Sequence, residues 1–178
     1  SFYDDAVLGV QGAIFMMIAH AFTSGALFLG TDYVYRRFKS RDIGDLQGIA
    51  KHMPIYASFV MLFAMSNVGL PGTSGFVGEF MIILAVFKAH MWIGLVAGLT
   101  LIIAPAYTLW MLKRVIFGVP GGNVLKAANG ALKGIKGIKD IDSIEALVFI
   151  ILAVLIIYFG VYPKPIINTS HETSTAYV

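Results

Sequence analysis

The sequence predicts an all-α membrane protein, a bundle of about four transmembrane helices of which one is broken at Leu70–Gly75. The chain is 58% hydrophobic and only 13% charged, and its mean hydropathy is +0.81. This apolar share exceeds that of ordinary soluble domains. The apolar residues also fall in long blocks, and a helix needs about 20 such residues to cross a hydrocarbon core of about 30 Å.

Four apolar stretches are long enough to cross a membrane, and they lie within a single membrane domain that covers residues 1–178. The predicted spans are 7–35, 55–88, 91–112 and 144–162. The last is the plainest, because no charged residue lies between Glu145 and Lys164. We interpret it as a helix that faces lipid or packs against its neighbours.

Basic residues in the loops 36–54 and 113–143 predict the orientation of the chain. By the positive-inside rule, both loops face the cytoplasm, or the matrix of a mitochondrion, and the two chain ends face the opposite side. The basic residues are Arg36, Arg37, Lys39, Arg41 and Lys51 in the first loop, and Lys113, Arg114, Lys126, Lys133, Lys136 and Lys139 in the second.

The span 55–88 poses a geometrical problem. A continuous helix of that length would measure roughly 50 Å, too long for one crossing and too short for two with a turn. It contains the sequence NVGLPGTSGFVGEF at 67–80, in which Pro71 removes a backbone donor, while Gly72 and Gly75 tolerate an unwound link. We therefore predict one crossing broken near the membrane midplane, with a link built from Leu70, Pro71, Gly72, Thr73 and Gly75.

Glu79 is the first candidate for proton transfer. Unwound backbone at this depth must face protein or water, and broken helices mark ion and substrate sites in transporters. We expect Glu79 in the first turn of the second half helix, where the helix dipole favours the carboxylate and burial favours the protonated acid. A carboxyl group in such a balance can take up and release a proton. The alternative is a helix cap near the membrane interface.

His20 is the second candidate, because ionisable residues inside a span are functional hypotheses by default. Met16, His20 and Ser24 share one helix face with Thr23 beside it, and we expect that face to look into the protein. Histidine exchanges protons near physiological pH. The alternative is a neutral imidazole that bonds a neighbouring helix. Ser24, Thr23 and Asn67 are candidates for polar support, as is Ser66, although a packing role for Asn67 and Ser66 is equally open.

The composition also excludes several classes of function. The chain has no cysteine, so it forms no disulfide and offers no thiolate for a metal or an iron–sulfur cluster. Its net charge of +3 resides in loops beside apolar blocks, which favours a role in membrane orientation over nucleic-acid binding. We predict no metal and no bound cofactor on this chain, and the lipid bilayer as its surroundings.

The sequence resembles a known family of membrane proteins. MIAHAFTSGALFLGTDYVYRR at 17–37, GDLQGIAKHMP at 44–54 and AMSNVGLPGTSGFVGEFMIILAVF at 64–87 are similar to the C-terminal part of subunit M, also called chain 4, of respiratory complex I. The similarity covers almost the whole chain. Complex I subunits of the chain 5 and chain 2 types carry a lysine after a different break, so Glu79 points to the chain 4 type.

The resemblance implies a role in proton pumping by NADH:quinone oxidoreductase. It implies that the spans are the eleventh to fourteenth helices of the subunit, that His20 lies on the polar axis of the membrane arm, and that Glu79 lies at the end of that axis. A glutamate and two lysines of the pathway belong to earlier helices. FMN, iron–sulfur clusters and quinone are expected in other subunits, neighbouring antiporter-like subunits are expected partners, and the location is a bacterial plasma membrane or mitochondrial inner membrane.

Two other readings come from other classes of protein. A subunit of a multi-subunit Na⁺/H⁺ antiporter or of a membrane-bound hydrogenase would share the fold and a similar broken helix, and the Glu79 type of break does not separate these from complex I. A membrane anchor without a transport role explains neither His20 nor the break.

Overall fold

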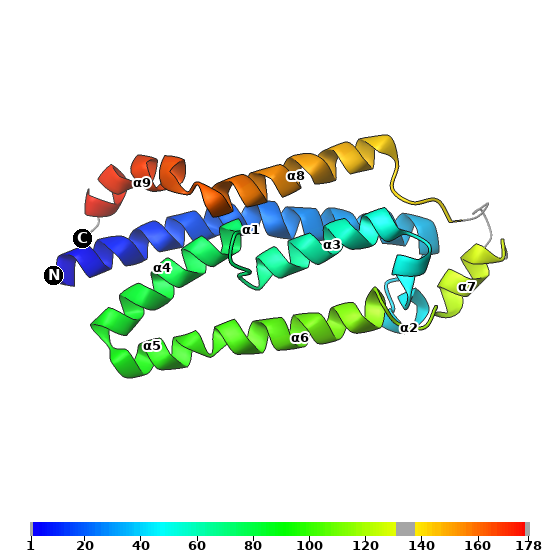
Figure 1. The fold of residues 1–178 in the computed structure, drawn as a ribbon, viewed down its shortest axis with the longest axis horizontal. Helices are drawn as coiled ribbons and strands as arrows, with labels where there is room; N and C mark the ends of the chain where they lie inside the picture. Colours follow the sequence, from blue (N-terminus) through cyan, green and yellow to red (C-terminus); the bar gives the residue numbers. More distant parts are fainter. Residues whose placement is uncertain (1, 131–137, 177–178) are drawn as a thin grey trace. The chain divides into compact units, whose positions relative to one another are not determined.

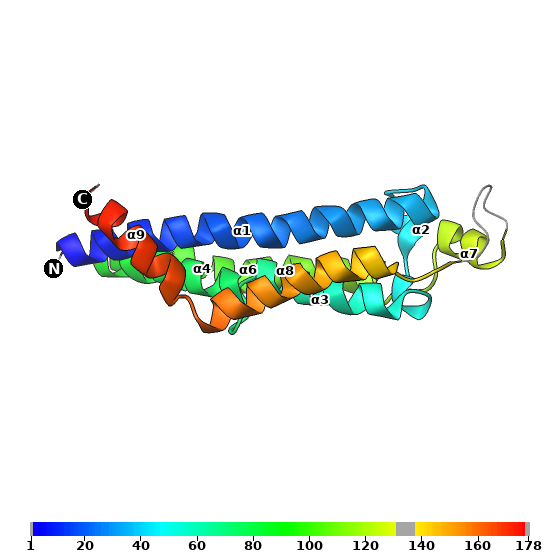
Figure 2. The ribbon, with the colours of Figure 1, turned by 90° about the horizontal axis from the view of Figure 1, so that it is seen from above.

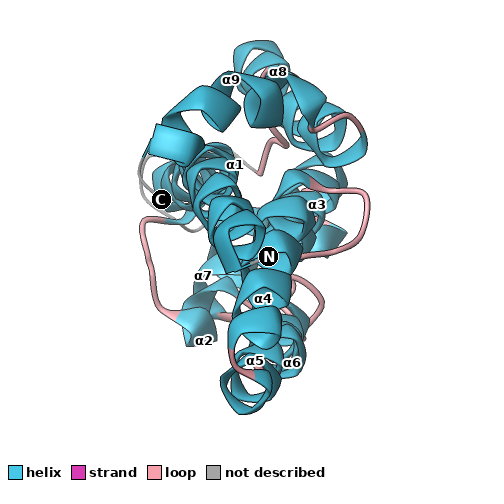
Figure 3. Cartoon of the chain, turned by 90° about the vertical axis from the view of Figure 1, so that its left-hand side faces the viewer, coloured by secondary structure: helices cyan, strands magenta, loops and turns pink. Residues whose placement is uncertain are grey.

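The computed structural model describes residues 2–130 and 138–176, and these residues form helices joined by loops (Figure 3). In order, the elements are α1 (Phe2–Phe38), α2 (Ile43–Leu46), the 3₁₀ helix η1 (Ile49–Lys51), α3 (Pro54–Asn67), α4 (Ser74–Ala89), α5 (Met91–Gly98), α6 (Thr100–Val115), α7 (Gly122–Ala128), α8 (Ser143–Val161) and α9 (Lys164–Ala176) (Figure 1). The predicted all-α class is confirmed. The basic residues Lys133 and Lys136 lie outside the described residues.

Three of the four predicted spans lack a break of several residues in the described chain, and one of these three comprises α5 and α6 with Leu99 between them. Asp5–Phe38, Met91–Val115 and Ser143–Val161 are each long and apolar enough to cross a membrane. The remaining predicted span, 55–88, is interrupted by a link between α3 and α4. α3 has 14 residues and α4 has 16, or about 21 and 24 Å of helix. Residues Ile43–Lys51 meet α3 at 110° and do not lengthen it. The predicted broken helix is therefore present, with its link at Val68–Thr73.

The chain divides into two compact units, each of which is described by itself. The first comprises residues 1–24, 65–105 and 154–178, and the second comprises 25–64 and 106–153.

In the first unit, α1 and α4 pack closely and antiparallel. A Cβ at Gly9 would meet Ala85 at 3.3 Å, one at Gly12 would meet Met81, and one at Gly78 would meet Met16. Residue numbers thus rise along α1 as they fall along α4. Lys88 Nζ lies 3.0 Å from Asp5 Oδ1 at the far end of the pair. The chain then reverses at His90, and α5 returns along α4 (Figure 1).

Helix α9 lies against the first part of α1 in the same unit (Figure 2). An apolar groove of about 440 Å³ lies between α1, α9 and the end of α8. It is lined by Ile14, Ile18, Phe159, Pro165, Ile166, Thr169 and Ser170. The Phe22 and Phe159 rings stack with their centroids 6.0 Å apart, which fixes α8 against α1 close to this groove.

In the second unit, the core is a cluster of aromatic rings around Phe149, which is fully buried. Tyr33 of α1, Phe59 and Phe63 of α3 all lie with ring centroids between 5.1 and 5.5 Å from that of Phe149. Aromatic pairs at this separation contribute beyond their buried area, so α8 holds α1 and α3 together.

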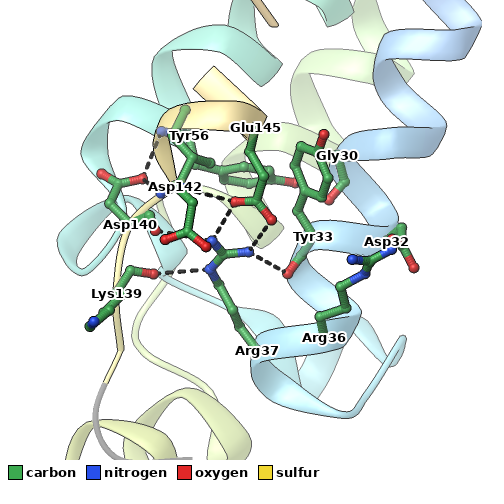
Figure 4. Close-up of polar contacts among 11 residues, drawn as sticks. Gly30, Asp32, Tyr33, Arg36, Arg37, Tyr56, Lys139, Asp140, Asp142 and Glu145 are labelled. Carbon is green, nitrogen blue, oxygen red and sulfur yellow. Dashed lines mark hydrogen bonds and ion pairs between the residues drawn. The ribbon is translucent and has the colours of Figure 1, made fainter. Parts of the chain in front are cut away.

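A largely buried ion pair between α1 and α8, with hydrogen bonds around it that reach α3, lies at one end of the second unit (Figure 4). Arg37 donates to both carboxylate oxygens of Glu145 at 3.2 and 2.5 Å, and the two side chains are only 14% and 15% exposed. Arg37 also donates to the backbone carbonyls of Lys139, Asp140 and Tyr33. The Asp140 carboxylate accepts from the first free N–H groups of α3, those of residues 55 and 56. We call this group the Arg37 clamp.

Candidate functional site

The link between α3 and α4 is a compact double turn. α3 ends in a Schellman motif, because the Gly69 N–H donates to Ser66 O at 3.2 Å and the Leu70 N–H donates to Met65 O at 3.0 Å. Gly69 has φ +74°, as that motif requires. Two carbonyl groups at the end of α3, those of Met65 and Ser66, are thereby bonded locally.

A β-turn completes the link. The Thr73 N–H and its hydroxyl both donate to Leu70 O, at 3.1 and 2.7 Å. Pro71 and Gly72 occupy the two central positions, and Gly72 has φ +92°, the combination typical of a type II turn. Thr73 is extended, with φ −109° and ψ 158°, and immediately precedes α4. The residues predicted for the link therefore form it, except that Gly75 already belongs to α4.

Gly75 serves close packing instead. A Cβ at this position would collide with the Ser66 carbonyl at the end of α3. A Cβ at Gly160 of α8 would likewise collide with the backbone of Gly72 and Thr73. α8 thus contacts the link at Gly72 and Thr73, while residues 70–72 are exposed in this chain. Unwound backbone in a membrane must be shielded from lipid.

Glu79 is the sixth residue of α4 and lies in its second turn, so the prediction of a first-turn position was wrong. The link ends earlier than the glycines suggested, because Ser74 and Gly75 are helical. The helix dipole acts mainly within the first turn. Its effect on Glu79 is therefore weaker than expected from the sequence.

The Glu79 carboxyl group folds back over the link. Its Oε2 atom occupies the space that a Cβ at Gly69 would fill, and its Oε1 atom lies 3.4 Å from the hydroxyl of Thr100, the first residue of α6. Glu79 is half-buried in this chain. The side chain that the sequence singled out is thus positioned by the link itself and by the neighbouring span.

The polar support comes from part of the set that the sequence suggested, Thr23 and Ser66, together with the hydroxyl of Ser74. Thr23 is buried, donates to Ala19 O at 2.9 Å and lies 3.3 Å from the Ser66 hydroxyl. Asn67 is the last residue of α3, and within the described residues its side chain forms no hydrogen bond. Ser74 is fully buried, and its hydroxyl lacks a hydrogen-bond partner among the described residues. Hydroxyl groups rather than the predicted amide therefore surround the link.

His20 differs from the prediction. Its side chain is exposed in this chain, while Thr23, on the adjacent face, is buried. The Ser24 hydroxyl donates to the His20 backbone carbonyl at 2.6 Å, so Ser24 supports the helix and not the imidazole. The described residues do not bring the His20 and Glu79 side chains into contact. On the helix face that we expected to look into the protein, Met16 and Ser24 are half-buried and His20 is exposed.

Thr100 and Gly160 were not part of the predicted site, whereas Ser66 was a candidate because it precedes the break. Thr100 and Gly160 lie in spans whose packing the sequence does not reveal. The described residues contain no group of three or more His, Cys, Asp or Glu side chains that could hold a metal ion.

A broken helix with a carboxyl group seated on its link is a feature that can be compared with known proteins. The family model described as "NADH:quinone oxidoreductase/Mrp antiporter, TM" matches residues 2–104, more than half of the chain. The chain belongs to this family. It is a multi-pass membrane protein of the antiporter-like type found in complex I.

Individual members of the family are similar over most of the chain. Subunit M of NADH-quinone oxidoreductase from Rickettsia prowazekii is 36% identical over 164 residues, which cover 92% of this chain and 31% of that protein. Chain 4 of NADH-ubiquinone oxidoreductase from Chondrus crispus is 35% identical over 168 residues, or 94% and 32%. Subunit M from Rhodobacter capsulatus is 50% identical over 110 residues, or 62% and 22%. The chain spans about a third or less of the length of these relatives.

Two solved structures share the fold. A chain of respiratory complex I from Thermus thermophilus with bound NADH matches with a TM-score of 0.81 and 29% identity, over 97% of this chain and 34% of that one. A chain of the Mrp complex from Dietzia sp. matches with a TM-score of 0.73 and 21% identity, over 96% and 38%. The second likeness shows the fold alone.

Proposed function

We propose that the chain is part of a proton-translocating membrane-arm subunit of NADH:quinone oxidoreductase, and that Glu79 carries protons at its broken helix. The position of the Glu79 carboxyl group carries this proposal. It lies in the interrupted span, over Gly69 and beside Thr100, where an ionisable group is costly unless it serves a purpose. The similarity to subunit M and chain 4 sequences supports the assembly.

The mechanism rests on a change in the proton affinity of Glu79. Quinone reduction occurs in other subunits, which also hold FMN and the iron–sulfur clusters, so this chain performs no redox chemistry. A change of charge along the membrane arm alters the free energy of ionising a half-buried carboxyl group. Glu79 then takes up a proton from one side and releases it toward the other. His20 is the proposed donor on the polar axis, where a helix of a longer subunit or of a neighbouring subunit covers its exposed face.

Glu79→Gln in the full-length subunit tests the proposal. Glutamine preserves the shape of the side chain but cannot ionise. We expect NADH-driven proton pumping into inverted vesicles to fall by roughly tenfold or more, as the loss of a proton-transferring group does elsewhere. Glu79→Asp should retain part of the activity, and Asp32→Asn, at an exposed carboxylate of α1, should retain all of it. Pumping at the full rate in the glutamine variant would refute the role of Glu79.

A Na⁺/H⁺ antiporter subunit is the second candidate, because the family model covers both types and an Mrp complex chain shares the fold. An antibody against residues 117–130 can capture the native assembly from solubilised membranes. NADH-dependent quinone reduction with flavin absorbance in the captured fraction supports complex I. An intact assembly without flavin, which exchanges Na⁺ for H⁺ after reconstitution, supports the antiporter.

A further inference from the structure

The hydroxyl of Thr100 has two oxygen neighbours and only one hydrogen to share. Its Oγ1 atom lies 2.7 Å from the backbone carbonyl of Ala97 and 3.4 Å from Glu79 Oε1. Hydroxyl hydrogen bonds cluster near 2.7–2.8 Å. The shorter distance favours a hydrogen bond to Ala97 O, which leaves a lone pair of Thr100 Oγ1 available to Glu79.

This arrangement suits one protonation state of Glu79. A protonated carboxyl group is a donor as well as an acceptor, so Glu79 can donate to Thr100 while Thr100 donates to Ala97 O. An ionised carboxylate is an acceptor only and would face another acceptor. Rotation of the hydroxyl hydrogen toward Glu79 removes that conflict and creates a charge-assisted bond, which is shorter and stronger than a neutral one.

The backbone around Thr100 permits that rotation. The helical ladder is interrupted between α5 and α6, where the Ile102 and Ile103 N–H groups both donate to Leu99 O at 3.0 Å. The Leu99 N–H donates to Val96 O at 3.1 Å and also lies close to Ala97 O, the carbonyl that the hydroxyl leaves when it turns. The other carboxyl oxygen of Glu79 lies over Gly69, which limits how far the side chain can move.

We propose that Thr100 is a positioning residue for proton transfer, whose hydroxyl accepts from protonated Glu79 and donates to ionised Glu79. This inference rests on the proposed function of Glu79 and adds a partner from the neighbouring span. No covalent bond to Thr100 forms or breaks. The transferred proton enters and leaves through Glu79, and Thr100 keeps its own hydrogen, which moves only between Ala97 O and Glu79 Oε1. The carboxyl group thus stays in one position through the cycle.

The test compares Thr100→Val with Thr100→Ser in the intact complex. Valine matches the shape of threonine without the hydroxyl, and serine keeps the hydroxyl. Thr31→Val is the matched control, because Thr31 is an exposed threonine that bonds its own helix at Leu27 O, 3.0 Å away. Infrared difference spectroscopy reports the C=O stretching band of a protonated carboxyl group, and the band absent from Glu79→Gln belongs to Glu79.

We expect Thr100→Val to shift the Glu79 band to higher wavenumber, because the O–H group loses its acceptor, and to slow pumping roughly three- to tenfold. Thr100→Ser and Thr31→Val should leave both unchanged. Thr100 is exposed in this chain, and Thr100→Ala is a second hydroxyl-free variant if valine hinders assembly. An unshifted band in both hydroxyl-free variants, or no protonated band attributable to Glu79 at any pH, overturns the inference. Full pumping by Glu79→Gln would instead refute the proposed function, while the band shift still decides the contact.

Discussion

Gly69, in the link between α3 and α4, has two structural roles. Its φ of +74° ends α3 in a Schellman motif, a conformation that costs an L-residue about 1–2 kcal/mol. Its missing side chain also leaves the space in which Glu79 Oε2 lies. The same glycine thus shapes the broken helix and seats the carboxyl group that we propose to carry protons.

Gly69→Ala should therefore impair both stability and pumping. We expect the loss of the left-handed cap to lower the free energy of unfolding by about 1–2 kcal/mol, and displacement of Glu79 to slow pumping. Thermal inactivation of the purified complex and NADH-driven proton uptake measure the two effects. Gly98→Ala is the control, because a Cβ there meets no atom within 4 Å and the residue ends a helix that tolerates alanine. Equal behaviour of the two variants would contradict this account.

The sequence predicted that the helix is broken, but it did not predict correctly the residue at which α4 begins. Proline and glycine within an apolar block, together with the length of that block, required an interruption. They could not decide which glycine ends the link, because Gly75 is needed for the approach of Ser66 and not for a turn. Glu79 consequently lies one turn deeper in α4 than predicted.

The polar partners were harder to predict, for a physical reason. Thr100 reaches Glu79 only because α5 reverses at His90 and packs along α4, and apolar spans carry little sequence information about their packing. The burial of His20 was expected from its polar neighbours. In this chain Thr23 is buried and donates to Ala19 O of its own helix, while His20 is exposed.

The Arg37 clamp connects the ends of α1, α3 and α8. Glu145→Ala leaves the Arg37 guanidinium largely buried with carbonyl partners and no counter-charge. We expect this to cost about 2–3 kcal/mol of stability. Asp32→Asn removes an ion pair to Arg36 whose side chains are 43% and 67% exposed, and should cost under about 0.5 kcal/mol. Thermal unfolding of the two purified variants measures the difference, and similar costs would show that the clamp contributes no more than a surface pair.

The orientation of the whole chain in the membrane depends on the side that each loop faces. Basic and aromatic side chains meet at the ends of two spans: Arg41 lies over the Tyr35 ring with 4.8 Å to its centroid, and Arg114 lies over the Trp110 ring with 4.5 Å. Such pairs are typical of membrane interfaces. The neutralisation of Arg37 by Glu145 does not weaken the orientation signal, because the positive-inside rule counts basic residues and not net charge.

Single cysteines can test the predicted orientation, since the chain has none of its own. Lys126→Cys on α7 and Asn168→Cys on α9 replace exposed residues. In sealed vesicles of known orientation, a membrane-impermeant maleimide should label position 126 from the cytoplasmic or matrix side and position 168 from the opposite side. The labelling of detergent-solubilised protein at both positions serves as the control for reactivity. Labelling in the reverse order would invert the direction in which Glu79 must release its proton, while labelling of both positions from one side would remove a crossing between them.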